Sequence, residues 1–91
     1  MPKTNLLAPL HPGEVLREEY LVPLGINPYE LAASMRVSRV HVERLLREEI
    51  SVTLDTALRL GAYFGTTPEF WLDIQVRFDL EAVQKKTLAA S

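Results

Sequence analysis

The chain has 91 residues, of which 47% are hydrophobic and 24% charged, and its formal net charge is −2. This length allows one domain with one modest core, and the composition excludes disorder along the whole chain. No cysteine is present, so disulfides, thiolate metal sites and cysteine catalysis are excluded and a cytoplasmic location is favoured.

The chain is expected to open with an arm and a helix. Residues 1–10 contain two prolines and no hydrophobic period, which predicts an extended arm. A first helix is expected from about Pro12 to Val22, because proline suits the first turn, where its missing N–H costs nothing. Pro23 and Gly25 are expected to end this helix.

Two short helices with a minimal connection are expected next. Asn27 is a good N-cap residue for the second helix, and Ser38 is one for the third. Only Arg36 and Val37 connect the two helices. The apolar faces consist of Leu31, Ala32 and Met35 on the second helix and of Val42, Leu45 and Leu46 on the third. This arrangement is typical of a helix-turn-helix motif, whose second helix enters a major groove of DNA.

Two further helices complete an all-α domain of five helices over residues 11–84. Thr53 caps the fourth helix, and Thr67-Pro68-Glu69 begins the fifth by the same logic. The expected apolar stripe of the fourth helix is Leu54, Ala57, Leu58 and Gly61. Apolar and polar residues do not alternate over any useful length, so no strand is expected. Residues 85–91 are predicted to be a frayed tail.

The exposed face of the third helix is rich in arginine. At 100° per residue, the face opposite its apolar stripe carries Val40, Arg44 and Arg47. Arginine is the commonest specific reader of guanine, and a short apolar side chain suits a thymine methyl group. The N-terminal amides of the second and third helices could hold phosphates. The residues predicted to contact double-stranded DNA are therefore Asn27, Tyr29, Arg36, Ser38, Arg39, Val40, His41, Glu43, Arg44 and Arg47.

An alternative reading of this face is an ordinary solvated surface. Glu48 and Glu49 follow the third helix directly, and carboxylates repel phosphates. Against this, the segment from Arg36 to Arg47 holds four arginines and one acid. A local positive patch of this kind attracts DNA even when the whole chain is slightly negative.

The fifth helix carries two apolar stripes, whereas a single small core needs only one. The stripe of Phe70, Trp71, Ile74 and Phe78 is expected to close the core. The second stripe consists of Leu72, Val76, Leu80 and Val83. We expect it to meet a second copy of the chain, because a two-fold dimer would place two recognition helices about 34 Å apart, in successive major grooves. The alternative is that residues 5–10 cover it.

The sequence offers no catalytic or metal-binding pattern. His11 and His41 are thirty residues apart and have no partners at ligand spacing, so no metal site is expected. The adjacent acids Glu18-Glu19 and Glu48-Glu49 diverge on their helices and are not acid–base pairs. No phosphate-binding glycine loop is present, and no apolar run approaches the roughly 18–20 residues of a membrane span. We therefore expect a protein that is not an enzyme and needs no cofactor.

Several segments resemble one family. Residues 11–19 (HPGEVLREE) resemble the opening of HigA-type antitoxins, which belong to the lambda-repressor-like (XRE) helix-turn-helix class. Residues 31–32, 37–39 and 44–46 are similar to the turn and recognition helix of that class. Residues 65–72 (GTTPEFWL) resemble a later signature of the HigA-type family. The likeness spans about residues 11–83.

The resemblance implies two partners. HigA-type proteins neutralise a HigB-type toxin, a ribosome-dependent mRNA endonuclease of RelE-like fold, and as dimers they repress their own operon. This chain departs from the family at Arg36, where the class usually has glycine, and at Glu48 and Glu49, where a glycine and basic residues are common. If Arg36 has a positive φ, the conformation costs about 1 kcal/mol.

The sequence therefore predicts a dimeric antitoxin and autorepressor that binds operator DNA and a HigB-like toxin. One alternative is a stand-alone XRE-type repressor without a toxin. The other is a toxin-binding inhibitor with little DNA binding, which the acids after the third helix suggest.

Overall fold

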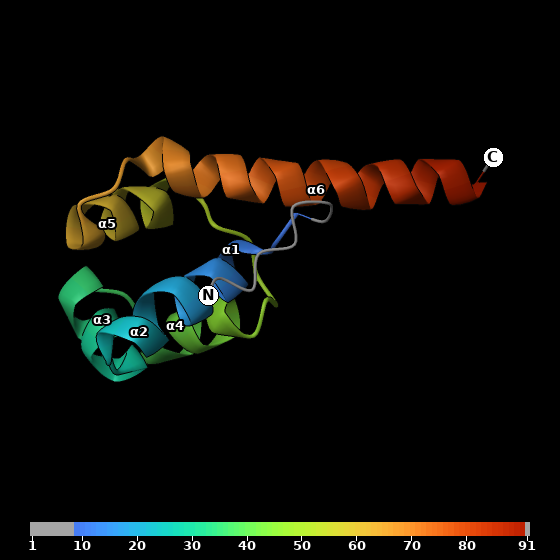
Figure 1. Ribbon diagram of the computed structural model, residues 1–91. Helices are drawn as coiled ribbons and strands as arrows, with labels where there is room; N and C mark the ends of the chain where they lie inside the picture. Colours follow the sequence, from blue (N-terminus) through green and yellow to red (C-terminus); the bar gives the residue numbers. More distant parts are fainter. Residues whose placement is uncertain (1–8, 91) are drawn as a thin grey trace.

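The computed structural model describes residues 9–90, and the side chains of residues 9–87. Helix one consists of three continuous segments: α1 (Pro12–Val15), the π-helical η1 (Leu16–Leu21) and α2 (Val22–Leu24). It is followed by α3 (Pro28–Met35), α4 (Arg39–Leu46), α5 (Leu54–Phe64) and α6 (Pro68–Ala90) (Figure 1). The described residues contain no strand, and the all-α, five-helix prediction is confirmed. Most of the predicted arm, residues 1–8, lies outside the described residues.

One core joins all five helices. The largest fully buried side chains include one from each of them: Leu16, Leu31, Leu45, Leu60 and Trp71. The indole of Trp71 lies 5.2 Å from the ring of Tyr20 on helix one, between centroids, and its Nε1 donates a hydrogen bond to Thr66 Oγ1 at 2.8 Å. Within residues 9–90, no helix is long and apolar enough to cross a membrane.

The sequence predicts that helix one ends at about Val22, before Pro23. In the structure the helix continues to Leu24 and ends at Gly25, whose φ is 65°. Just before the proline the chain is wound as a π-helix, in which the N–H of Val22 bonds to the carbonyl of Arg17, five residues back. A proline inside an α-helix clashes with the carbonyl four residues before it. The wider π-turn gives the ring room, and the helix passes through.

Four of the α-helical segments end close to a residue with a positive φ. Gly25, Arg36 and Gly65 directly follow α2, α3 and α5, whereas α4 is followed first by Arg47, with φ −85°, and then by Glu48, with φ 62°. At Arg36, φ is 58°, and the backbone N–H groups of Arg36 and Val37 bond to carbonyls of the last turn of α3. The condition considered from the sequence, a positive φ at Arg36, is therefore met. Only glycine takes this conformation without steric cost, so Arg36 and Glu48 are both strained relative to glycine.

The fourth predicted helix is rotated from its expected orientation. The buried residues of α5 are Thr56, Ala57, Leu60 and Gly61, whereas Leu54 and Leu58 are 62% and 51% exposed. The expected stripe therefore contains only two residues that are buried. The reason is tertiary, because α5 packs against both α3 and α6, and the hydroxyl of Thr56 finds partners within the protein.

Helix α6 is longer than expected and extends beyond the rest of the molecule (Figure 1). It continues to Ala90 through residues predicted to be a frayed tail, because most residues after Glu81 favour helix and Lys85 Nζ pairs with Glu81 Oε1 at 3.2 Å. Of the stripe expected in the core, Trp71 is buried and Phe70 is exposed; Ile74 and Phe78 are half-buried. The second stripe has Leu72 half-buried and its remaining members exposed, namely Val76, Leu80 and Val83.

Candidate nucleic-acid interface

The helix-turn-helix is built by side-chain caps at two helix starts. Asn27 Oδ1 accepts a hydrogen bond from the backbone N–H of Tyr29 at 2.7 Å, and Ser38 Oγ accepts one from the N–H of His41 at 3.0 Å. Each cap satisfies an N–H group that has no partner inside its helix. The C-terminal end of α3 is held by Arg59 of α5, whose Nη1 donates to the carbonyl of Met35 at 2.6 Å. Sequence reasoning missed Arg59, because its partner is 24 residues away.

The sequence-predicted DNA-contacting residues lie together on this motif. Val42 and Leu45 of α4 are buried, and the predicted residues of α4 lie on its other faces. His41 and Glu43 are half-buried. The exposed members are Asn27, Tyr29, Arg36, Ser38, Arg39, Val40, Arg44 and Arg47. Val40 is 60% exposed, which leaves its methyl groups available for an apolar contact.

The start of α3 and the start of α4 are in contact through one pair of side chains. The guanidinium carbon of Arg39 lies 3.8 Å from the ring centroid of Tyr29. Stacking of this kind adds a cation–π attraction and limits the conformations of a long, exposed side chain. Arg39 is therefore held at the N-terminal end of α4, near the backbone N–H groups that can donate hydrogen bonds to a phosphate.

The acids that follow α4 are each paired with an arginine. Arg44 Nε lies 3.5 Å from Glu49 Oε1, and Arg17 Nη2 lies 3.5 Å from Glu48 Oε2. Arg17 also donates to the carbonyl of Leu46 in the last turn of α4. The carboxylate of Glu18 beside it raises the pKa of Arg17. The negative charge that follows α4 is thus partly neutralised by arginines of the chain itself.

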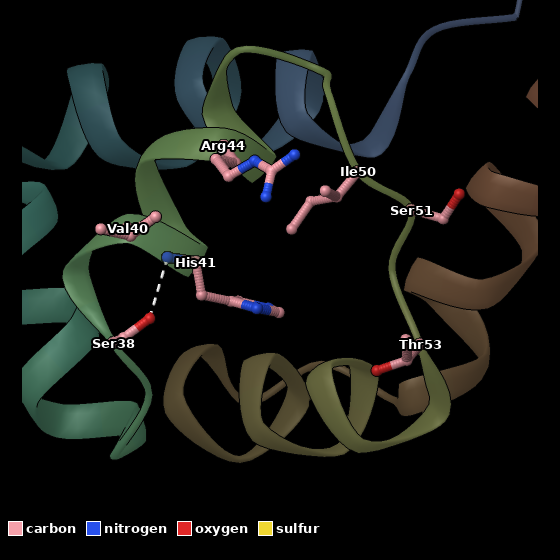
Figure 2. Close-up of a pocket in the computed structure, with 7 residues that line it drawn as sticks. All are labelled: Ser38, Val40, His41, Arg44, Ile50, Ser51 and Thr53. Atoms are coloured by element: carbon pink, nitrogen blue, oxygen red, sulfur yellow. Dashed lines mark hydrogen bonds between the residues drawn. The ribbon is translucent and has the colours of Figure 1, made fainter.

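A pocket of about 490 Å³ opens beside the exposed face of α4 (Figure 2). One wall is α4 and the other is the loop that leads into α5. The lining residues are Ser38, Val40, His41, Arg44, Ile50, Ser51 and Thr53. Sequence reasoning assigned no site role to Ile50, Ser51 or Thr53, because the return of the loop alongside α4 carries no local sequence signal.

Helix one positions α4 by a close backbone approach. A Cβ atom added at Gly13 would lie 1.9 Å from the carbonyl oxygen of Leu45, so only glycine fits there without a shift. His11 caps the same helix, because its Nδ1 accepts from the N–H of Gly13 at 2.9 Å. Its ring is buried and stacks edge-on against Phe78, 5.0 Å between centroids. Burial lowers the pKa of His11, although nearby carboxylates, led by Glu48, oppose the shift.

The loop after α4 is also anchored to α6. The side chain of Gln75 is buried. Its Oε1 accepts from the N–H of Val52 at 2.8 Å, and its Nε2 donates to Asp79 Oδ1 at 2.9 Å. Gln75 therefore connects α6 to the loop that lines the pocket.

No family model matches the chain, but comparison with individual proteins finds relatives in sequence and in structure. Virulence-associated protein I of Dichelobacter nodosus is 42% identical over 81 residues, which cover 89% of this chain and 75% of that protein. Antitoxin HigA-1 of Vibrio cholerae is 43% identical over 72 residues, which cover 79% of this chain and 68% of that protein. The structure of Pseudomonas aeruginosa antitoxin HigA with the higBA promoter has a TM-score of 0.86 and 36% identity, and the match covers 90% of this chain and 89% of that chain.

Proposed function

Because the chain belongs to the family of HigA-type antitoxins, we propose that it neutralises a small toxin and represses its own operon. The observation that carries the DNA-binding part is the exposed, arginine-bearing face of α4, capped by Ser38 and flanked by the stacked pair of Arg39 and Tyr29. A solved relative with 36% identity is bound to promoter DNA, which supports the same use of this face.

Base reading falls to the exposed face of α4, and phosphate binding falls to the N-terminal ends of α3 and α4. Arg44 and Arg47 are exposed on the DNA-facing side, where a guanidinium fork reaches guanine O6 and N7 together. Val40 offers its methyl groups to thymine. Arg39 and the capped N-termini of α3 and α4 hold the phosphate backbone, which fixes the register of the helix in the groove.

A two-fold dimer through α6 supplies the second recognition helix. Val76, Leu80 and Val83 are each more than half exposed, and together with Leu72 they form one stripe along a helix that extends beyond the core (Figure 1). Burying this stripe against its copy removes apolar surface from water. The two α4 helices would then lie about 34 Å apart, as successive major grooves require.

The toxin is a HigB-like mRNA endonuclease, in keeping with the family, and the chain itself acts by binding rather than by catalysis. The alternative of a stand-alone repressor differs only in lacking this partner. The alternative of an inhibitor with little DNA binding depends on the acids after α4. Because Glu48 is paired with Arg17, an arginine outside the DNA-contacting set, its repulsion of phosphate is reduced, and we favour the DNA-binding form.

The test is the salt dependence of binding to the DNA upstream of the gene. A protein that makes about 6–10 phosphate contacts loses roughly 10³–10⁵ in affinity between 50 and 200 mM salt. Arg44→Ala should weaken binding to the upstream site by about 1–3 kcal/mol, with a smaller loss on scrambled DNA. Binding that does not depend on salt would contradict the assignment of the whole face to DNA. An equal loss on both DNA sequences would contradict the base-reading role of Arg44.

A further inference from the structure

Arg44 lies on the exposed face of α4 and has an acid beside it. Its Nε lies 3.5 Å from Glu49 Oε1, and both side chains are about half exposed. In Figure 2 the guanidinium group of Arg44 lies between α4 and the loop that follows this helix. The surface ion pair is therefore formed by the arginine to which the proposed function gives a base-reading role.

The backbone brings Glu49 to Arg44. The N–H of Glu49 donates to the carbonyl of Arg44 at 2.9 Å, and the N–H of Glu48 donates to the carbonyl of Leu45 at 3.0 Å. Together with the φ of 62° at Glu48, these two bonds form the Schellman arrangement of a helix end. That arrangement commonly places two apolar side chains in contact at the positions that Arg44 and Glu49 occupy here. The main chain therefore sets the two charged residues side by side.

This backbone link bears on the strength of the pair. An exposed ion pair usually contributes little, because two long side chains must be held in one geometry. An arginine that becomes fixed in a complex also loses much side-chain freedom. Since the main chain already joins Arg44 to Glu49, a smaller part of this ordering is left to the side chains. The pair is thus suited to restrict Arg44 before DNA binds.

The pair leaves the recognition groups of Arg44 available. A guanidinium group has five N–H donors, distributed over Nε and the two terminal nitrogens. Glu49 approaches the Nε atom. The fork formed by the two terminal nitrogens remains for guanine, whose O6 and N7 accept from an arginine together.

We propose that Glu49 is a positioning residue, which holds Arg44 in an orientation suited to reading guanine while its own charge weakens binding to DNA of any sequence. The role rests on the proposed function, because it requires Arg44 to contact a base. The acid after α4 then serves discrimination between sequences at some expense of affinity. Glu49 contacts DNA only through its effect on Arg44 and through its charge.

The first experiment measures the motion of Arg44 in the free chain, by nitrogen-15 relaxation of the arginine Nε–H groups. The signal of Arg44 is identified by its loss in Arg44→Ala. Arg47 is the comparison, because it is exposed at the end of the same helix and takes part in none of the ion pairs between described residues. The Nε–H of Arg44 should be the more restricted one, and Glu49→Gln should make it as mobile as that of Arg47. Equal mobility in the unchanged chain would overturn the proposal.

The second experiment measures affinities for the upstream DNA and for scrambled DNA. Glu49→Gln removes the charge with little change of shape. It should raise the affinity for scrambled DNA and lower the ratio of upstream to scrambled affinity by about 2- to 5-fold, the range expected for one exposed ion pair. In an Arg44→Ala background the same change should leave the ratio as it is. An equal fall in both backgrounds would show that Glu49 does not act through Arg44.

Glu48→Gln is the matched control. It removes the same charge from the adjacent residue, whose partner Arg17 lies outside the predicted DNA-contacting set. This variant should raise the affinity for both DNAs by a similar factor and keep their ratio unchanged. If Glu49→Gln behaves in the same way, Glu49 only repels phosphate, and its positioning role is overturned.

Failure of this role and failure of the proposed function give different results. If the unchanged chain binds both DNAs equally, the proposed DNA-binding function fails, and the role of Glu49 fails with it. If the unchanged chain discriminates but Glu49→Gln raises the ratio, the ion pair keeps Arg44 away from the base. In that case only the role of Glu49 is overturned.

Discussion

Gly13 is the residue at which helix one and the recognition helix come closest. Gly13→Ala should destabilise the chain by about 2–3 kcal/mol, because the new Cβ would meet the backbone oxygen of Leu45 and one helix would have to shift. Denaturant unfolding measures this loss. Gly25→Ala is the matched control: it has a positive φ but nothing within 4 Å of its Cβ, and it should cost about 1 kcal/mol. A smaller cost at Gly13 than at Gly25 would contradict the close approach.

His11 makes stability depend on pH. The unfolded chain takes up the proton at the usual pKa of 6.5, whereas burial lowers the pKa of His11 in the folded chain. Between these two values the unfolded state binds more protons, so the free energy of unfolding falls as the pH drops below 6.5. Above pH 6.5 this contribution is fully present.

His11→Asn tests this dependence, because asparagine keeps an N-cap acceptor but does not titrate. Unfolding of both proteins by denaturant between pH 7.5 and 5 should show a shallower decline for the variant, even if it is less stable at pH 7.5. An unchanged slope would show that His11 does not keep a lowered pKa in the folded chain.

At the same scale, the sequence predicts some features and misses others for a physical reason. The caps at Asn27, Ser38 and Thr53 were predictable, because each side-chain oxygen accepts a hydrogen bond from a backbone N–H only two or three residues further along the chain. The roles of His11 and Gly13 were not, because they depend on what packs against helix one. The Thr56–His41 hydrogen bond also joins two helices whose packing the sequence alone does not reveal.

At the scale of elements, helix starts and the two faces of α4 could be predicted, whereas the buried face of α5 could not. Capping and helical period are local properties of the sequence. Which face of α5 is buried depends on α3 and α6, and Thr56 is accepted in the interior because its hydroxyl has partners. The passage of helix one through Pro23 depends on a π-turn for which the sequence has no evident signal.

Helix α6 carries the element-scale prediction. Leu80→Glu should give monomers and weaken binding to the upstream DNA, because a carboxylate cannot be buried in an apolar interface without a partner. Light scattering after size exclusion measures the mass. Ala82→Glu is the control, since it adds the same charge to an exposed position outside the stripe. A dimeric Leu80→Glu would contradict the assignment of Leu72, Val76, Leu80 and Val83 to the interface.

At the scale of the whole molecule, the DNA-facing surface is held from two sides. Helix one contacts the end of α4 through Gly13 and Arg17, and α6 holds the following loop through Gln75 and Val52. The helix proposed to contact the second copy is therefore connected to the DNA-facing helix α4 through the loop that follows α4. This arrangement suits a protein whose two recognition helices must be held at a set spacing.

The measurement that tests the central claim most directly is growth of cells that express the small reading frame next to this gene, alone and together with this chain. We predict that the neighbour alone stops growth and that co-expression of this chain restores it, because the chain is proposed to neutralise a HigB-like toxin. A harmless neighbour, or one that stays toxic when this chain is present, would contradict the antitoxin function.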